Sequence, residues 1–432
     1  MNLRLITSTI ILLVITGTTA SAQFSFGNYA LQNVNIIDVN SNDVLYDYTI
    51  LINNDRISDV LPSKNYIAND SVQSILLKGK FVVPGLIDAH VHFATDPSEE
   101  RRDNAEKVLK EMLLTGVTSV RDMAGDARAL SDLSRDALVG DIVAPNIYYS
   151  SLMAGSNFFS DPRTIASAQG GTSGKMAYMK AIDDNSNLVL DVAEAKGTGA
   201  TGIKMYAYLS NNEVVKIVEE AKKQNIPVWS HAALQKAKPS EIITSGVISI
   251  SHANMLVYEN DESESLIKSW IDHEANGNEK EFWDKEFEKL DFSELYNLMI
   301  KNNVVFDATL SVLVVYKNHP KMIWRYEIGK RIIQQAHKKG VLIAAGSDSD
   351  QETFVQHEMK LLINECGISP LEAIIAATKY SAMATGILEN EGTIEIGKKA
   401  NLLFLNSNPI ENIDHLDDIF LVVKNGKLYN KK

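Results

Sequence analysis

Cysteine is almost absent from this chain, because Cys366 is the only one among 432 residues. A single cysteine excludes a disulfide framework within the chain and zinc sites ligated by cysteine. Basic residues are also in deficit, since 42 Lys and Arg face 55 Asp and Glu, for a formal net charge of −13. No basic stripe is present, so the sequence argues against nucleic acid as a partner.

Long apolar runs are lacking as well. The most apolar stretch, 6–15, follows Arg4 and is too short for a comfortable membrane span. Ala20-Ser21-Ala22 resembles the small-residue cleavage site of a signal peptide, so we expect residues 1–22 to be removed after Ala22. The sequence then predicts a periplasmic or secreted protein without stable membrane insertion. A retained N-terminal anchor is the alternative.

Short strand patterns occupy both ends of the remaining chain. Segments 29–39, 48–53 and 57–61 carry Val and Ile between clusters of Asn and Asp, and the segments 392–406 and 419–429 have the same character. Asn425-Gly426 is typical of a hairpin turn. We expect the two ends, 23–80 and 388–432, to pair into one small β-sandwich domain.

Between these ends, apolar strand-like runs alternate with amphipathic helical ones. Alternation of this kind favours an α/β fold with a parallel sheet. Eight units over roughly 250 residues favour a (β/α)8 TIM barrel, here predicted over 81–387, with its active site at the carboxyl ends of the strands. The eight predicted strands are 82–90, 117–122, 145–150, 201–206, 227–231, 247–252, 304–309 and 341–348.

One segment after the sixth predicted strand concentrates the negative charge. Residues 255–300 contain 13 Asp and Glu against 4 Lys, so −9 of the net −13 lies there. The segment also carries two tryptophans, Trp270 and Trp283. A solvated helical excursion with its own small core would explain it. We favour the functional alternative, a lid over the strand ends.

Potential metal ligands follow the predicted strands. His90 and His92 are two residues apart at the end of the first, so both side chains point to the same side of an extended chain. Each such residue taken singly is most often a hydrogen-bonded buried group. Five strands that deliver ligands to the same end of one barrel favour a metal centre. The candidates are His90, His92, Lys204, His231, His252 and Asp348.

These residues lie in motifs that resemble the amidohydrolase superfamily. The stretch Pro-Gly-Leu-Ile-Asp-Ala-His-Val-His at 84–92 resembles its first-strand signature, and Ala-Ala-Gly-Ser-Asp at 344–348 resembles the stretch with its last-strand aspartate. Segments 370–378 and 392–402 resemble its closing helix and the return to the β domain. Within the superfamily the chain looks most like the binuclear group of imidazolonepropionases and Xaa-Pro dipeptidases (prolidases).

The resemblance implies two divalent cations. His90 and His92 would bind one, with Asp348 beside it, and His231 and His252 would bind the second. Lys204 would be carbamylated and bridge the two cations; burial lowers the pKa of a lysine and so provides the neutral amine that reacts with carbon dioxide. Mixed nitrogen and oxygen ligands favour zinc, with manganese, iron and cobalt as alternatives.

The resemblance further implies hydrolysis of a C–N bond in an amide or peptide-like small molecule. Hydroxide that bridges the metals would attack the carbonyl, and Asp348 would shuttle the proton to the leaving nitrogen. The alternatives are a lactone, ester or organophosphate hydrolase, an isomerase or deaminase, and a non-catalytic, metal-retaining binding protein. A homo-oligomer is compatible with the sequence.

One position departs from the family pattern. Many dipeptidase-like relatives carry Tyr or His two residues after the fifth-strand histidine, where this chain has Ala233. A contact to a substrate carboxylate is therefore missing or relocated. Tyr206, Tyr208 and Arg121 are candidates to replace it, although both tyrosines would be equally well explained by packing at the barrel rim.

Overall fold

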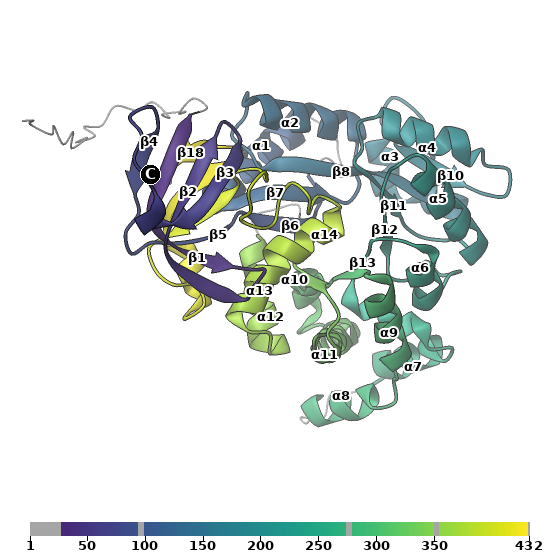
Figure 1. Ribbon diagram of the computed structural model, residues 1–432. Helices are drawn as coiled ribbons and strands as arrows, with labels where there is room; N and C mark the ends of the chain where they lie inside the picture. The colour runs from purple at the N-terminus through teal and green to yellow at the C-terminus, as the bar shows by residue number, and fades with distance from the viewer. Residues whose placement is uncertain (1–26, 94–98, 274–278, 350–353, 431–432) are drawn as a thin grey trace, which may run out of the picture.

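The computed structural model describes residues 27–93, 99–273, 279–349 and 354–430. The expected signal peptide, 1–22, and its cleavage site lie outside the described residues. Within the described part of the chain, no helix combines the length and the apolar character needed to cross a membrane. Figure 1 shows a barrel of strands and helices beside a separate sheet in which purple and yellow strands, the two ends of the chain, lie side by side.

Eight strands form the barrel, and each pairs in parallel with the next. Between the segment after the last strand and the first, the Ala89 amide donates to the Ala345 carbonyl at 3.1 Å and the Asp348 amide to the His90 carbonyl at 2.7 Å. The predicted (β/α)8 barrel is confirmed. Its strands are β6 (Leu86–Val91), β7 (Val117–Asp122), β8 (Asn146–Gly155), β11 (Gly202–Met205), β12 (Val228–His231), β13 (Ser249–Ser251), β14 (Val305–Asp307) and β15 (Ile343–Ala344).

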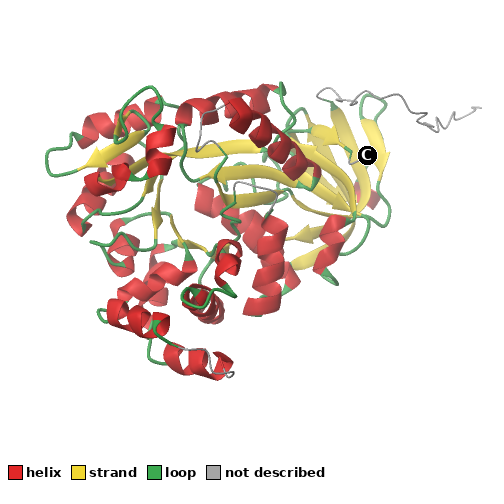
Figure 2. Ribbon diagram, turned by 180° about the vertical axis from the view of Figure 1, so that it is seen from behind, coloured by secondary structure: helices red, strands yellow, loops and turns green. Residues whose placement is uncertain are grey.

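Helices surround these strands, as Figure 2 shows in red around yellow. A short antiparallel pair, β9 (Lys175–Met176) and β10 (Met179–Ile182), extends the sheet at β8. The helices are α1 (Glu99–Leu114), α2 (Ala127–Val139), α3 (Pro162–Ser167), α4 (Leu188–Gly197), α5 (Asn211–Lys223), α6 (Pro239–Ser245), α7 (Ser263–Ile271), α8 (Glu279–Phe287), α9 (Ser293–Asn302), α10 (Leu310–Leu313), α11 (Ile323–Lys339), α12 (Val355–Cys366), α13 (Pro370–Ile375) and α14 (Ser381–Thr385).

The predicted first strand, 82–90, is divided in two at Gly85. Its first part, β5 (Phe81–Pro84), pairs with strands of the terminal sheet, and only β6 belongs to the barrel. A Cβ atom at Gly85 would lie 2.2 Å from Thr118 Oγ1, so the chain can pass this point only without a side chain. The turn at Gly85 therefore joins the two sheets immediately before β6, the strand that contains His90.

The second sheet contains strands from both ends of the chain, as predicted. Its order is β18-β17-β16-β5-β1-β2-β3, and β4 also pairs with β1. All these strands hydrogen-bond into one sheet. Leu31 and Ile50 of the N-terminal strands share an apolar cluster with Phe404 and Val423 of the C-terminal strands. The added bounds are β1 (Asn28–Asp38), β2 (Asp43–Asn53), β3 (Arg56–Pro62), β4 (Gln73–Leu76), β16 (Leu402–Leu405), β17 (Ile419–Lys424) and β18 (Lys427–Tyr429).

The described part of the acidic segment 255–300 includes α7, α8 and most of α9; α7 and α8 pack beside α11, and α9 packs beside α6. The Trp270 ring lies 6.1 Å from that of Trp283 and 5.8 Å from that of Trp324 on α11, measured between centroids. Arg331, also on α11, donates to an Asp284 carboxylate oxygen at 2.6 Å. The two tryptophans of the segment are thus buried, and Trp270 packs directly beside Trp324 of a barrel helix.

Candidate metal centre

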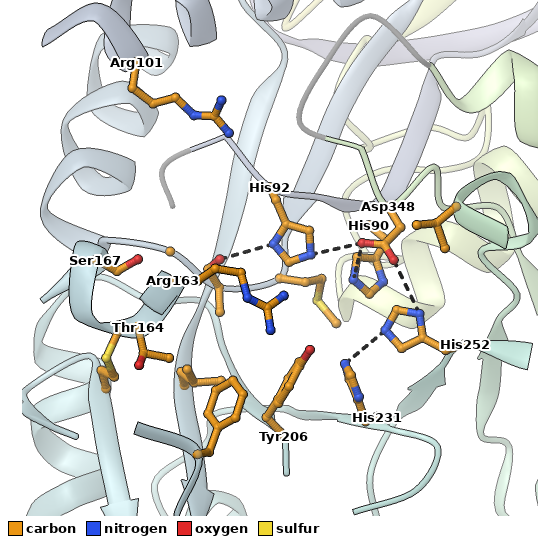
Figure 3. Close-up of a pocket in the computed structure, with 17 residues that line it drawn as sticks. His90, His92, Arg101, Arg163, Thr164, Ser167, Tyr206, His231, His252 and Asp348 are labelled. Atoms are coloured by element: carbon orange, nitrogen blue, oxygen red, sulfur yellow. Dashed lines mark hydrogen bonds and ion pairs between the residues drawn. The ribbon is translucent and has the colours of Figure 1, made fainter. Parts of the chain in front are cut away.

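A cavity of about 430 Å³ opens at the carboxyl ends of the barrel strands. Figure 3 shows side chains from several strands directed into it. Five of the six predicted metal ligands line its wall: His90, His92, His231, His252 and Asp348. The structure therefore brings together residues that are up to 258 positions apart in the chain.

Asp348 lies among the imidazoles. One of its carboxylate oxygens is 3.1 Å from His92 Nε2 and 3.5 Å from His90 Nε2, and the other is 3.5 Å from His252 Nδ1. The His252 and His231 Nε2 atoms face each other at 3.0 Å. Potential ligand atoms of His90, His252 and Asp348 all lie within 4.8 Å of one another, which is close enough to share a cation.

Two of these ligands have unusual backbone conformations. His252 has φ 78° and Asp348 has φ 51°, both in a region that residues with a Cβ atom seldom occupy. His252 follows directly after β13, and Asp348 lies four residues after the end of β15. Conformations of this kind cost free energy and persist where the surrounding fold holds a side chain in place for a function.

The outer nitrogens of the imidazoles are held by neighbouring groups. His90 Nδ1 is 2.7 Å from Asp307 Oδ2, and His92 Nδ1 is 3.3 Å from the Ala124 carbonyl oxygen. A carbonyl or carboxylate partner places the proton on Nδ1, so that Nε2 keeps its lone pair and points into the site. This arrangement is the usual one for histidines that ligate a metal, and the donor set fits divalent cations.

The charge states of the site also suit a metal. Burial lowers the pKa of His252 to about 3 and that of His231 well below its usual range, so both rings stay neutral and keep the lone pair that a cation needs. Burial alone would raise the pKa of Asp348, but His90 and a hydrogen bond from His92 outweigh it and hold the pKa low. Asp348 is therefore an ionised carboxylate beside the neutral rings of His231 and His252, while the same carboxylate helps to raise the pKa of His92.

Lys204 is fully buried within β11. Its Nζ donates to Ser251 Oγ at 3.2 Å, and Ser251 in turn donates to Asp307 at 2.9 Å. Burial, followed by repulsion from the Arg121 cation, lowers the pKa of Lys204 to about 7. Near neutral pH a large share of this side chain is a neutral amine, which is the form required for carbamylation.

Arg121 does not contact the cavity, contrary to its prediction as a substrate contact. It is fully buried and donates to the carbonyls of Ala89 and Ala384, to Ser249 Oγ, and to Asp307 Oδ2 at 3.1 Å. Position 121 points into the barrel interior, where β7 faces β14. The guanidinium therefore supports Asp307 beneath the cavity, and a substrate does not reach it.

The two tyrosine candidates after β11, Tyr206 and Tyr208, lie in different environments. Tyr206 lines the cavity, and its ring centroid lies 3.8 Å from that of His231 and 4.5 Å from that of Phe158. Tyr208 is 37% exposed and is not among the residues that line the cavity. The chain turns at Tyr208 with φ 63°, so the alternation that would have put both side chains on the same side is broken.

Asp307 and Asp88 are site residues that our reading of the sequence did not single out. Asp307 ends β14 just as His231 ends β12, and a polar residue that closes an apolar strand was the signal that could have identified it. Asp88 accepts hydrogen bonds from the backbone amides of His90 at 3.1 Å and Ser347 at 2.9 Å, and so joins the first and last strand ends. Both carboxylates are fully buried.

The predicted lid is not formed by the part of the acidic segment that the structure describes. None of its described residues lines the cavity, and Figure 1 places α7 and α8 away from the strand ends, at the lower edge of the barrel. Its aromatic side chains are used in packing against α11. The wall of the cavity instead includes Phe158, Arg163, Thr164 and Ser167, which follow β8.

Comparisons with known proteins agree with this geometry. By sequence, the chain is similar to the ochratoxinase of Aspergillus niger, with 24% identity over 401 residues that cover 81% of this chain and 75% of that protein. It is similar to the probable imidazolonepropionase of Bos taurus, with 31% identity over 102 residues, 22% of this chain and 24% of that one. A solved Xaa-Pro dipeptidase with bound methionine has a TM-score of 0.74 and 23% identity, and the match covers 94% of this chain and all of that one.

The sequence profile of the amidohydrolase family matches residues 81–429. The matched region contains the whole barrel and all six predicted metal ligands. The prolidase-like and imidazolonepropionase relatives are those that the sequence motifs indicated. The chain belongs to the amidohydrolase family.

Proposed function

We propose that this protein is a metal-dependent hydrolase that uses two divalent cations. Its proposed substrate is a small amide or peptide-like molecule, whose C–N bond it cleaves. Membership of the amidohydrolase family supports hydrolysis of such a bond. The observation that carries the proposal is the convergence of four imidazoles and one ionised carboxylate at the strand ends, with a buried lysine nearby in β11. No structural role needs such a combination inside an open cavity.

The residues divide into two sets. We assign His90, His92 and Asp348 to one cation and His231 with His252 to the other, with carbamylated Lys204 between them. Zinc is the cation that this mixed nitrogen and oxygen set favours. When bound, the two cations would lower the pKa of a water molecule and polarise the substrate carbonyl.

Asp348 is the proposed proton carrier. Its carboxylate is ionised and lies within 3.5 Å of three imidazoles, so it is placed at the centre of the donor set. In the proposed reaction it accepts the proton of the attacking water and returns it to the nitrogen that leaves. His90 and His92 are held in their orientation by Asp307 and the Ala124 carbonyl and do not need to move.

The cavity wall favours a substrate with an apolar part. Leu152, Phe158, Met179 and Val312 line it together with the imidazoles. The printed names of the relatives, an ochratoxinase and a Xaa-Pro dipeptidase, are those of proteins of similar fold, and they support amides and dipeptides as the first compounds to test. We also propose export, with a mature chain that begins at Gln23; mass spectrometry of protein from its native host tests this.

The central experiment combines metal analysis with turnover. Protein loaded with Zn²⁺ in bicarbonate buffer should contain two metal ions per chain and hydrolyse members of a panel of N-acyl amino acids, dipeptides and lactones. Lys204→Ala should lose most of this activity, and a small carboxylic acid should restore part of it by standing in for the carbamate.

One metal ion per chain in active protein, or an unchanged activity of the Lys204→Ala variant, would overturn the binuclear assignment. Two retained ions without turnover of any compound would favour a binding protein.

A further inference from the structure

Arg163 is a cation on the cavity wall that the proposed reaction leaves without a role. It lies in the connection that follows β8, two residues after Asp161, the N-cap of α3. Figure 3 shows its guanidinium directed into the cavity, between His92 and Tyr206. The side chain is 64% exposed, so it faces open space in the cavity and is not packed into the protein.

The guanidinium is held in a defined orientation. Its Nε and Nη2 donate to the two carboxylate oxygens of Asp161 at 3.0 and 2.8 Å, and Asp161 is itself fixed by the Arg163 backbone amide at 2.9 Å. A guanidinium has five N–H donors, and this pair uses two of them. The remaining edge, which includes Nη1, can bind an oxyanion without reorganising the side chain.

The groups around Arg163 suit a carboxylate joined to an apolar group. Figure 3 shows the Tyr206 side chain pointing into the cavity beside the Arg163 guanidinium. Phe158 and Met179 line the same cavity and provide apolar surface in it. The Tyr206 ring also contacts the His231 ring, with the two centroids 3.8 Å apart, so this corner of the cavity adjoins the candidate metal centre directly.

A second copy of the same local motif shows that the motif alone does not create this site. Arg128 lies two residues after Asp126, the N-cap of α2, and donates from Nε and Nη2 to its carboxylate oxygens at 2.8 and 2.6 Å. Arg128, however, donates to the Gln169 carbonyl and lies over the ring of Tyr178, and it is not among the residues that line the cavity. The two arginines therefore form a matched pair, and only one of them faces the metal centre.

We propose that Arg163, together with the Tyr206 hydroxyl, binds a carboxylate of the substrate, so that the preferred substrates are amides with a free carboxylate next to an apolar group. This deepens the proposed function and rests on it for the site of cleavage. It also accounts for Ala233, which stands where many relatives carry Tyr or His. In this protein the carboxylate contact comes from the connection after β8 instead. Because Asp161 balances the charge of Arg163, recognition comes mainly from directed N–H donors.

The test uses two probes that differ only in charge, N-benzoylglycine and its amide, N-benzoylglycinamide. Benzoate release reports cleavage of the same bond in both. In zinc-loaded Arg163→Met, kcat/KM for the acid should fall about 10- to 100-fold, mostly through KM, while the value for the amide should change less than about 3-fold. Arg128→Met is the matched control and should keep the wild-type preference. Arg163→Lys should lie between wild type and Arg163→Met, because it keeps the charge but loses the planar fork.

The outcomes separate this inference from the proposed function. Equal losses for both probes, or the same loss in Arg128→Met, would overturn the carboxylate site while leaving hydrolysis intact. If wild type releases benzoate from neither probe, the proposed function fails for this substrate class, and calorimetry on the same proteins decides the inference alone. Weaker binding of the acid to Arg163→Met, but not to Arg128→Met, supports the carboxylate site. Equal dissociation constants of the acid for wild type and Arg163→Met, or no binding of either probe, overturn it. Metal content and melting temperature confirm that each variant is folded and loaded.

Discussion

Two buried polar clusters lie near opposite ends of the barrel strands and differ in how completely their members are paired. At the amino end of β8, the Glu391 carboxylate accepts from Asn146 at 3.2 Å, Tyr148 at 2.6 Å and Lys399 at 2.8 Å, and also from Ser119. Both of its oxygens are used. This cluster joins the barrel to the terminal sheet, since Asn425 of the β17–β18 turn bonds to Asn146.

The cluster at the carboxyl ends is left partly open. Within the described residues, Asp307 Oδ1 and Asp88 Oδ2 are buried and have no hydrogen-bond partner. Gly346 lies against this region, where a Cβ atom would come within 2.4 Å of Asp307 Oδ1. Unpaired buried oxygens cost free energy, and a fold tolerates them where they serve a site.

The comparison teaches how one barrel separates stability from chemistry. A polar network built on a carboxylate with both oxygens hydrogen-bonded stabilises the junction of two sheets. A network with unused carboxylate oxygens, next to imidazoles that line a cavity, can support bound cations. This agrees with the general division of such barrels into a stabilising amino end and a reactive carboxyl end. The two clusters should therefore respond in opposite ways to mutation.

The largest effect is expected for Asp348→Asn. An amide keeps the shape of the side chain and one oxygen ligand but cannot accept the proton, so kcat should fall about 10²- to 10⁴-fold. The free energy of unfolding should change little by comparison. Turnover on the best substrate of the panel, measured with elemental analysis of the same sample, checks this. A variant that retains more than a tenth of the wild-type kcat would remove Asp348 as the proton carrier.

Asp307→Asn tests whether the open cluster supports the metals. The change removes the charge that pairs with buried Arg121 and weakens the acceptor of His90 Nδ1, at 3.1 and 2.7 Å. We expect zinc affinity to fall about 10- to 100-fold, and the free energy of unfolding of the metal-free protein to fall by about 3 kcal/mol. Competition with a chromophoric chelator measures the first and urea denaturation the second. Wild-type zinc affinity in Asp307→Asn would show that the contact to His90 is incidental.

Glu391→Gln should have the opposite profile. It leaves Lys399 without its anionic partner and lowers the free energy of unfolding by about 1–3 kcal/mol, while zinc content and kcat stay at wild-type values. Glu281→Gln, in the exposed pair with Lys285 at 3.1 Å, is the control and should change stability by less than about 0.5 kcal/mol. A loss of bound zinc in Glu391→Gln would erase the distinction between the two clusters.

The smallest effect concerns Lys424, beside the closed cluster. Its Nζ donates to the Ala137 carbonyl at 2.8 Å, and burial lowers its pKa to about 7. Between that value and the ordinary lysine pKa, the unfolded chain binds more protons than the folded one, so this group makes stability rise with pH. Lys424→Met should flatten the rise between pH 7 and pH 9 by up to about 1.4 kcal/mol per pH unit. Parallel urea-denaturation profiles for the two proteins would contradict the buried, weakly charged state.

Much of the site follows from local pattern. Apolar runs that end in polar residues predicted the strands, and because parallel strands of a barrel all direct their carboxyl ends to the same face, His231, His252 and Asp348 had to meet. The two-residue spacing of His90 and His92 similarly placed both on the side of the cavity. These inferences depend only on periodicity and strand direction, which the sequence contains.

Only the tertiary structure decided which side chains from different strands meet inside the barrel. Arg121 and Asp307 are 186 residues apart, and nothing in their local sequence shows that they pair. The turn at Tyr208 and the direction of Arg163 depend on backbone conformations outside regular strands, where alternation does not apply. The acidic segment was predicted to cover the cavity from its position after β13, yet Trp270 packs between Trp283 and Trp324 of α11 instead. Periodicity determines which face a residue occupies, whereas only packing in three dimensions determines what that face meets.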